Sequence, residues 1–224
     1  TYELPKAGVG EYQVESNFAE HTLNEIAGVV ANAVFKAEAE EGTALNSVEV
    51  FVNRNTITVV NSNGVNKTQV KYSAMVEAIP TYNGKEESVE LYQQYNFSTF
   101  EAETVKQEIS QKLQEVKARA SAVKPDFSLD CKVSLNTQEL GELFGTLCRE
   151  LNFATVYAHA GLFHKGDAIQ ENPTGDKITI TMAGSLPGNI RSACFDSDGM
   201  TLRATRIVED GKAAVNFLTM ETDE

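Results

Sequence analysis

Residues 48–60 read VEVFVNRNTITVV and residues 70–78 read VKYSAMVEA, and apolar residues alternate with polar ones in both stretches. Such alternation is typical of β-strands that bury one face. Asparagine-containing turns are expected where the alternation breaks, at Asn53-Arg54-Asn55, Asn63-Gly64 and Asn83-Gly84. The sequence therefore predicts an antiparallel meander of about four strands over 47–98, with one polar face.

Two amphipathic helices are expected on either side of the meander, at 18–40 and 101–121. Asn17 with Glu20, and Ser98 with Glu101, have the spacing of a capping box. Each helix then carries one apolar stripe, formed by Leu23, Ile26, Ala27, Val30 and Val34 in the first and by Val105, Ile109, Leu113, Val116 and Ala120 in the second. Because each stripe and the meander have a single apolar face, both helices are predicted to pack on one face of the sheet.

A second strand, helix and hairpin region is expected after Pro125. A strand is predicted over 127–133 and a helix over 138–153, capped by Asn136 with Glu139. A further strand at 178–180 and a hairpin of 200–208 with 212–218, around Asp210-Gly211, follow. Since helices and strands occur in blocks, the predicted fold class is α+β, with one domain at 1–125 and a second at 126–224.

Composition limits the classes of function that the chain could have. The 224 residues include 19 basic and 32 acidic side chains, giving a net charge of −13, which argues against direct binding to a nucleic-acid backbone. No apolar run approaches the roughly 20 residues of a membrane span, so a soluble cytoplasmic protein is expected. Cys131, Cys148 and Cys194 are predicted to be reduced, buried thiols.

Motifs for chemistry are sparse. The sequence has no P-loop, dinucleotide fingerprint or nucleophile elbow. The run Asp196-Ser197-Asp198-Gly199 is interpreted as a tight acidic turn, because it lacks the remaining ligands of a calcium loop. His159 and His164 are candidate zinc ligands, but Ala160 stands where a metallopeptidase motif would place its glutamate.

Four stretches, in this order, resemble the TldD/PmbA family, also called modulators of DNA gyrase. They are Val59-Val60-Asn61-Ser62-Asn63-Gly64, the strand and helix of 126–151, Phe195-Asp196-Ser197-Asp198-Gly199, and Thr205-Arg206-Ile207-Val208-Glu209-Asp210-Gly211. The likeness covers the chain from about residue 17. Family members are about twice as long, so the chain resembles their middle and early C-terminal portion.

The resemblance implies two subunit types. The TldD type carries H-E-x-x-x-H on the helix that corresponds to 138–153, and the PmbA (TldE) type lacks this motif and pairs with TldD in a zinc peptidase acting on unstructured peptides. In the family register the motif falls on Phe144, Gly145 and Arg149, none of which replaces a zinc ligand or general base. The resemblance thus implies a PmbA/TldE-like subunit with no catalytic residue, and zinc only in a TldD-type partner.

Two alternatives stay open. The chain could be an active zinc peptidase that uses His159 and His164, with a base such as Asp167 or Glu171, or a binding module without a protease partner. Self-association or pairing with a partner is also expected at a sheet edge, because only Glu49, Arg54, Lys67 and Lys71 are charged between Val48 and Tyr72. The helix at 138–153 is expected to be held by core packing, with Phe144 in that core.

Overall fold

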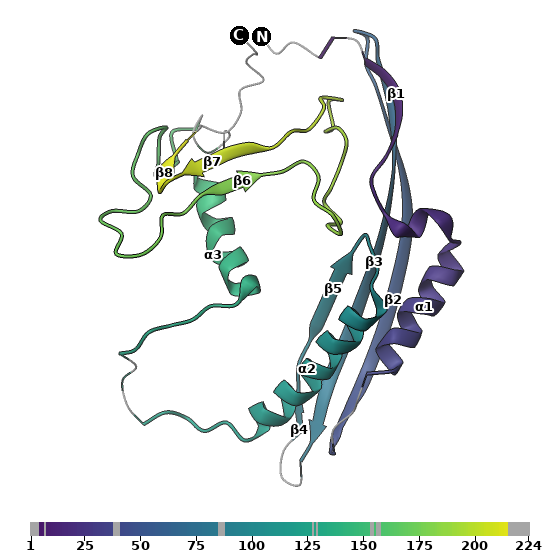
Figure 1. Cartoon of the computed structure of the whole chain (residues 1–224), viewed down its shortest axis with the longest axis vertical. Coiled ribbons are helices and arrows are strands. Elements are labelled where there is room, and N and C mark those ends of the chain that lie inside the picture. Colours follow the sequence, from purple (N-terminus) through teal and green to yellow (C-terminus); the bar gives the residue numbers. More distant parts are fainter. Residues whose placement is uncertain are drawn as a thin grey trace. The chain divides into compact units, whose positions relative to one another are not determined.

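The computed structural model describes residues 5–6, 8–37, 41–84, 88–126, 128, 130–152, 155 and 158–214. The fold class is α+β, as the sequence predicts (Figure 1). The chain forms two compact units, one of residues 1–126 with 184–202 and one of residues 127–183 with 203–224. The proposed domain boundary near residue 125 stays a prediction about how the two parts fold.

The sheet of the first unit is built around β3 (Val65–Asn83). On one side β3 pairs antiparallel with β2 (Thr43–Val60) over almost its whole length. On the other side it pairs in turn with β1 (Gly8–Gln13), β5 (Gln93–Phe97) and β4 (Ser88–Glu90). Every strand of this sheet is therefore hydrogen-bonded to β3.

The expected turn at Asn53-Arg54-Asn55 is wrong, because β2 runs through it without a break. Asn53 lies opposite Ser73 and Asn55 opposite Lys71 in the register of β2 and β3. This segment has no glycine to take the positive φ of a tight hairpin turn, so pairing with a strand of equal length prevails. The turn at 61–64 does form: Gly64 has φ 93, and the Asn61 side chain accepts hydrogen bonds from the N–H groups of Asn63 and Val65.

The N-terminal segment contributes a strand that the sequence analysis did not predict. Residues 8–13 form β1, which runs parallel to β3 from the Gly8–Val65 pair to the Gln13–Val70 pair. The sheet is thus mixed, although the strands within 47–98 pair antiparallel with one another. A lone parallel edge strand has no turn signal linking it to its partner, so the local pattern could not reveal it.

Both expected helices form and pack on one face of the sheet, with different starts (Figure 1). A 3-10 turn, η1 (Asn17–Glu20), precedes α1 (Leu23–Phe35), whose capping box is Thr22 with Glu25. Asn17 does not cap α1, because its amide exchanges hydrogen bonds with the backbone of Phe100. Helix α2 (Ala102–Ala120) starts after Glu101 without a side-chain cap, so the capping box at Ser98 is also wrong.

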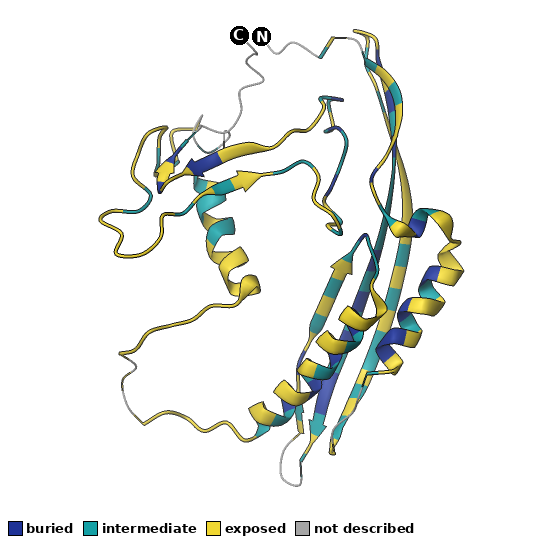
Figure 2. Ribbon diagram, viewed as in Figure 1, coloured by how far each residue is buried: buried dark blue, intermediate teal, exposed yellow. Residues whose placement is uncertain are grey.

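The core of the first unit lies between the two helices and β3, where Figure 2 shows a buried stripe on each element. Short alanine side chains at Ala74 and Ala78 flank Val76 on β3 and let the helices come close. The remaining buried members come from η1 and the helices: Phe18, Ile26, Val30, Val34, Val105, Ile109 and Leu113. These are largely the stripe residues expected from the sequence.

The opposite face of β3 is covered near its start by the segment 184–202, held by two buried polar side chains. The Gln69 amide donates to the Phe195 carbonyl (3.3 Å) and accepts from the Cys194 N–H (2.8 Å). The Lys67 ammonium donates to the Gly199 carbonyl (2.7 Å) and the Thr201 hydroxyl (3.4 Å). Strand β3 therefore organises both faces of the unit.

The acidic run at 196–199 is a tight turn, as predicted. Asp196 accepts hydrogen bonds from the N–H groups of Asp198 and Met200. Gly199 has φ 86, and a Cβ there would lie 2.6 Å from a Val65 methyl. Glycine is thus needed for both conformation and space.

The second unit contains α3 (Thr137–Glu150) and a small sheet of β6 (Ile180–Met182), β7 (Thr205–Glu209) and β8 (Lys212–Ala213). The capping box of Asn136 with Glu139 is confirmed. Positive φ at Asp210 and Gly211 forms the predicted β7–β8 turn, while residues 215–218 of the expected hairpin lie outside the described residues. The strand expected over 127–133 is wrong, since none of its described residues is in a strand.

We predict that Gln69→Leu lowers the free energy of unfolding of the first unit by about 1–3 kcal/mol, because the Phe195 carbonyl and Cys194 N–H lose their partner in a buried place. Urea unfolding measures the change. Gln114→Leu, at an exposed position of α2, is the matched control and should change stability little. An equal effect of both variants would contradict the role of Gln69.

Candidate functional site

Helix α3 carries Phe144, Gly145 and Arg149, on which the sequence analysis expected the metal motif to fall, and its apolar stripe is only partly covered. Leu147 and Cys148 contact a small core made by Leu151 with buried residues of β7 and β8. Leu140 and Leu143, two turns and one turn before Leu147, are 37% and 56% exposed. One end of α3 is thus anchored while the other presents leucines to the surroundings.

The expectation that Phe144 lies in a core is not met. Phe144 and Gly145 are half-buried, Arg149 is exposed, and no residue of α3 is fully buried. The Arg149 guanidinium donates to the Thr146 hydroxyl at 2.8 Å. The fully buried apolar side chain at this place is Leu151, just after the helix, because the stripe turns inward only at its C-terminal end.

His159 and His164 are both exposed, and the structure gives each a different local role. His159 lies in a turn with φ 55. The His164 N–H donates to the Asp167 carboxylate at 2.7 Å, and its ring Nδ1 lies 3.5 Å from the same carboxylate. Within the described residues no group of three or more His, Cys, Asp or Glu side chains could hold a metal ion.

All three cysteines are free thiols, but their predicted burial is only partly right. Cys131 is exposed, whereas Cys148 and Cys194 are half-buried. Burial raises the pKa of both half-buried thiols, and at Cys194 the charge of Lys71 acts in the opposite direction. These thiols therefore have little of the thiolate character that a nucleophile needs.

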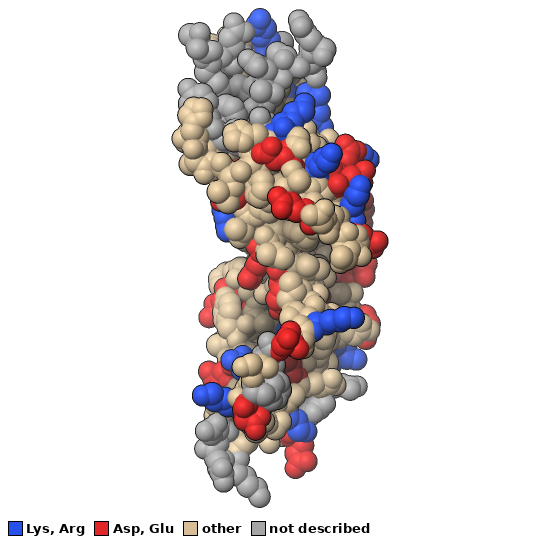
Figure 3. Space-filling model, turned by 90° about the vertical axis from the view of Figure 1, so that its left-hand side faces the viewer, with Lys and Arg blue, Asp and Glu red and all other residues tan. Residues whose placement is uncertain are grey.

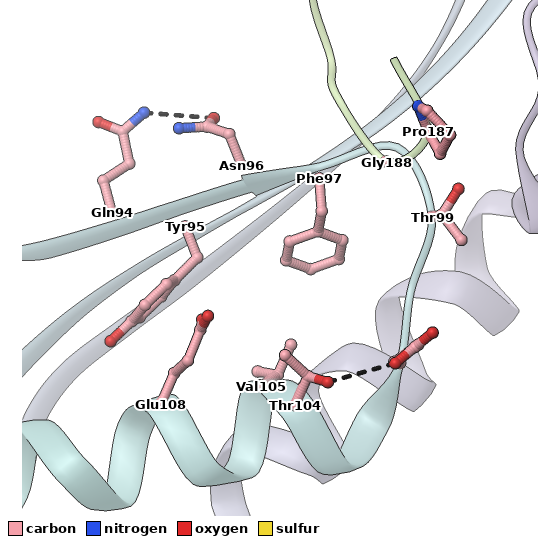
Figure 4. A pocket seen from close by; sticks show the side chains of 11 residues that line it. Gln94, Tyr95, Asn96, Phe97, Thr99, Thr104, Val105, Glu108, Pro187 and Gly188 are labelled. Atoms are coloured by element: carbon pink, nitrogen blue, oxygen red, sulfur yellow. Dashed lines mark hydrogen bonds between the residues drawn. The ribbon is translucent and has the colours of Figure 1, made fainter. Parts of the chain in front are cut away.

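A groove with polar and aromatic walls lies beside β5 in the first unit, and the sequence analysis missed it. It has a volume of about 440 Å³ and is lined by β5, the start of α2 and the Pro187-Gly188 turn. Figure 4 shows the rings of Tyr95 and Phe97 pointing from β5 toward α2, while Glu108 points from α2 toward β5. The groove thus combines two aromatic walls with a carboxyl group.

The electrostatics of the groove are unusual for a solvated surface. Removal of water around its carboxyl raises the pKa of Glu108, although the side chain as a whole is exposed. Burial raises the pKa of Tyr95, and the charge of Glu108 adds to the increase. The Tyr95 hydroxyl is buried and has no hydrogen-bond partner in the described structure, so it is free to bind a polar group that enters.

Charge elsewhere is mixed. On the face drawn in Figure 3, Lys and Arg side chains lie among Asp and Glu side chains rather than in one basic area. Within the described residues, no helix has the length and apolar character to cross a membrane.

Comparison with known proteins gives one match to a family model and several solved structures of the same fold. A family model for the PmbA/TldA metallopeptidase C-terminal domain matches residues 128–222. TldE from Thermococcus kodakarensis has the same fold, with a TM-score of 0.66 and 16% identity over 96% of this chain and 49% of that one. A proposed modulator of DNA gyrase from Bacteroides thetaiotaomicron gives a TM-score of 0.65 at 15% identity, over 96% of this chain and 49% of that one. A second, from Thermotoga maritima, gives a TM-score of 0.61 at 13% identity, over 98% of this chain and 51% of that one.

None of the curated proteins matches this sequence. Residues 128–222 resemble a domain of the TldD/PmbA family, in agreement with the resemblance of the sequence motifs, and the chain shares the fold of TldE. It spans about half the length of the solved structures that it matches.

We predict that Leu151→Ala destabilises the second unit by about 2–5 kcal/mol, the range for a buried leucine, and that Phe144→Ala costs less than the roughly 3 kcal/mol at the low end for a buried phenylalanine. Hydrogen exchange of the β7 amides measures both. A larger loss for Phe144→Ala than for Leu151→Ala would show that the stripe is covered differently.

Glu108 also makes stability depend on pH. Because its pKa is raised in the folded state, folding binds its proton more tightly, and this contribution is lost as pH rises from the ordinary glutamate pKa through the raised value. We expect Glu108→Gln to remove this decline, so that the variant gains thermal stability relative to the wild type between mildly acidic and neutral pH. Melting temperatures across that range test it, and a constant difference would contradict the assignment.

Proposed function

We propose that the chain is a catalytically silent, PmbA/TldE-like subunit that takes part in proteolysis of unstructured peptides with a TldD-type partner. The observation that carries the proposal is that α3, in the region matched by the family model, contains no histidine between Thr137 and Glu150. The metal motif cannot stand on this helix in any register. The likeness to TldE supports the same subunit type.

The exposed leucines of α3 support a role in assembly. Leu140 and Leu143 lie on the same side of the helix, one turn apart, and no described residue buries them. In a subunit that lacks the H-E-x-x-x-H motif, an exposed apolar helix face is suited to contact with a partner subunit rather than to catalysis. Zinc is expected only in the TldD-type partner.

The outer edge of β2 is the second surface that we propose for subunit contact. Among the described residues β2 has no neighbour on this side, and Glu49 and Arg54 are its charged side chains. Lys67 and Lys71, which the sequence analysis also counted, lie on the central strand β3. An edge of this length with so few charges suits pairing with another chain.

The backbone register shows which residues of β2 could pair outward. The Asn61 N–H donates to the Val65 carbonyl, so between Val48 and Val60 the backbone groups of odd-numbered residues point to β3 and those of even-numbered residues, such as Thr56, point to the free edge. Proline at Thr56 would remove an outward N–H and leave the bonds to β3 intact.

We predict that the chain forms a complex with a TldD-type subunit from the same cell, and that only the complex cleaves an unstructured peptide. Light scattering and a peptidase assay on the separate and mixed proteins test this. Thr56→Pro should weaken the association, or any self-association of the chain, about tenfold or more, and Thr56→Ala should not. Cleavage by the chain alone, or recovery without a TldD-type partner, would favour the alternatives.

A zinc measurement separates the alternatives further. We expect less than stoichiometric zinc in the metal-stripped and reconstituted chain, because its described residues form no three-ligand group. Stoichiometric zinc that disappears in His159→Ala or His164→Ala would instead establish the active peptidase. Absence of both zinc and any TldD-type partner would establish the binding module.

A further inference from the structure

The backbone of β5 has a free edge toward the groove. The Leu91 N–H donates to the Pro80 carbonyl, and the pairing from Gln93–Ala78 to Phe97–Ala74 continues in the same register. Odd-numbered residues therefore point to β3, and the N–H and C=O groups of Gln94 and Asn96 point away from it. No described strand pairs with this side of β5.

One hydrogen bond already follows this geometry. The Ser98 N–H, at the end of the same edge, donates to the Gly188 carbonyl at 2.9 Å. The Pro187-Gly188 turn thus closes one end of the groove and leaves Gln94 and Asn96 beyond it. Backbone from elsewhere in the sequence can evidently dock at this edge.

The side walls define the ligand further. A strand added to β5 would direct alternate side chains to the α2 side, where Tyr95, Phe97 and Glu108 line the groove (Figure 4). Glu101 contributes a second carboxyl group, which accepts a hydrogen bond from the Thr104 hydroxyl at 3.3 Å. Among the described residues, no Lys or Arg lines the groove, so two carboxyl groups and two aromatic rings face the incoming side chain.

A long basic side chain satisfies this environment. Its methylene groups would pack on the rings of Tyr95 and Phe97, and its charge would meet the Glu108 carboxyl group, which points from α2 toward β5. The buried Tyr95 hydroxyl, which has no partner, offers an additional acceptor for an ammonium or guanidinium group. Backbone and side-chain features thus point to the same ligand.

We propose that this groove binds an extended peptide segment with alternating basic residues, which adds a strand to β5 and places a Lys or Arg side chain between Tyr95, Phe97 and Glu108. The inference uses residues of the first unit alone. It goes beyond the proposed function and does not depend on α3, on zinc or on the edge of β2.

The test is binding of a short fluorescein-labelled peptide in which Thr and Lys alternate, followed by fluorescence anisotropy with the full chain. We expect Glu108→Gln to weaken binding about tenfold, the loss of one charge-assisted hydrogen bond. Replacing each Lys of the peptide by Gln should have an effect at least as large. Higher salt should weaken binding to the wild type and much less to Glu108→Gln.

Backbone pairing is tested separately. Asn96→Pro removes an outward N–H and should weaken binding about tenfold, whereas Asn96→Ala keeps that N–H and is the matched control. Circular dichroism and melting temperature verify that both variants fold. A peptide N-methylated on the nitrogens that face β5 gives the same information with the wild-type chain, and it too should bind weakly.

Failure of the wild type to bind the Thr-Lys peptide would overturn the proposal, as would binding unaffected by Asn96→Pro and by N-methylation. A wild-type oligomer that Asn96→Pro converts to monomer would also overturn it, since a second copy would then occupy the edge. The test is independent of Thr56→Pro and of peptidase activity, so its outcome is distinguishable from that of the proposed function.

Discussion

Pairing with β3 is the constraint on which the rest of the first unit depends. All four other strands of the sheet are hydrogen-bonded to this one strand, and its Ala74, Val76 and Ala78 form the surface against which both helices pack. Because side chains alternate along a strand, the same element presents Gln69 and Lys67 to the opposite face. There they hold the segment 184–202 by hydrogen bonds to its backbone. One strand thus fixes the helices, the sheet order and a part of the chain more than a hundred residues away.

This attachment divides the region that the family model matches. Residues 184–202 belong to the first unit, while most of 128–222 belongs to the second. The acidic turn at 196–199 contacts Val65 and Lys67 of β3. Its Gly199 lies against the Val65 side chain, and the Gly199 carbonyl accepts a hydrogen bond from the Lys67 ammonium. The turn therefore helps to cover one face of β3. The motif therefore serves to dock a returning segment, and its carboxylates are used in part to shape the turn itself.

Three surfaces of the described chain could contact other molecules. The outer edge of β2 and the outer edge of β5 both present unpaired backbone groups, and α3 presents leucines that no described residue covers. Under the proposed function, these surfaces serve for contact with other chains. The two edges differ in character: the edge of β2 is long and sparsely charged, which suits another subunit, whereas the edge of β5 is short and flanked by carboxyl groups, which suits a basic peptide.

The sequence by itself determined the fold class, both helices on the sheet, the α3 capping box and the β7–β8 turn, because each depends on local periodicity or on residues close in the chain. Tertiary structure alone decided that β2 runs through Asn53-Arg54-Asn55 without a turn. It also decided that the Asn17 side chain forms hydrogen bonds with the backbone of Phe100 instead of capping α1, and that Phe144 stays half-buried. Likewise, the groove joins residues near 95 and 105 with Pro187-Gly188. No local pattern encodes such contacts, since they form only when hydrogen bonds and burial between distant segments outweigh local preference.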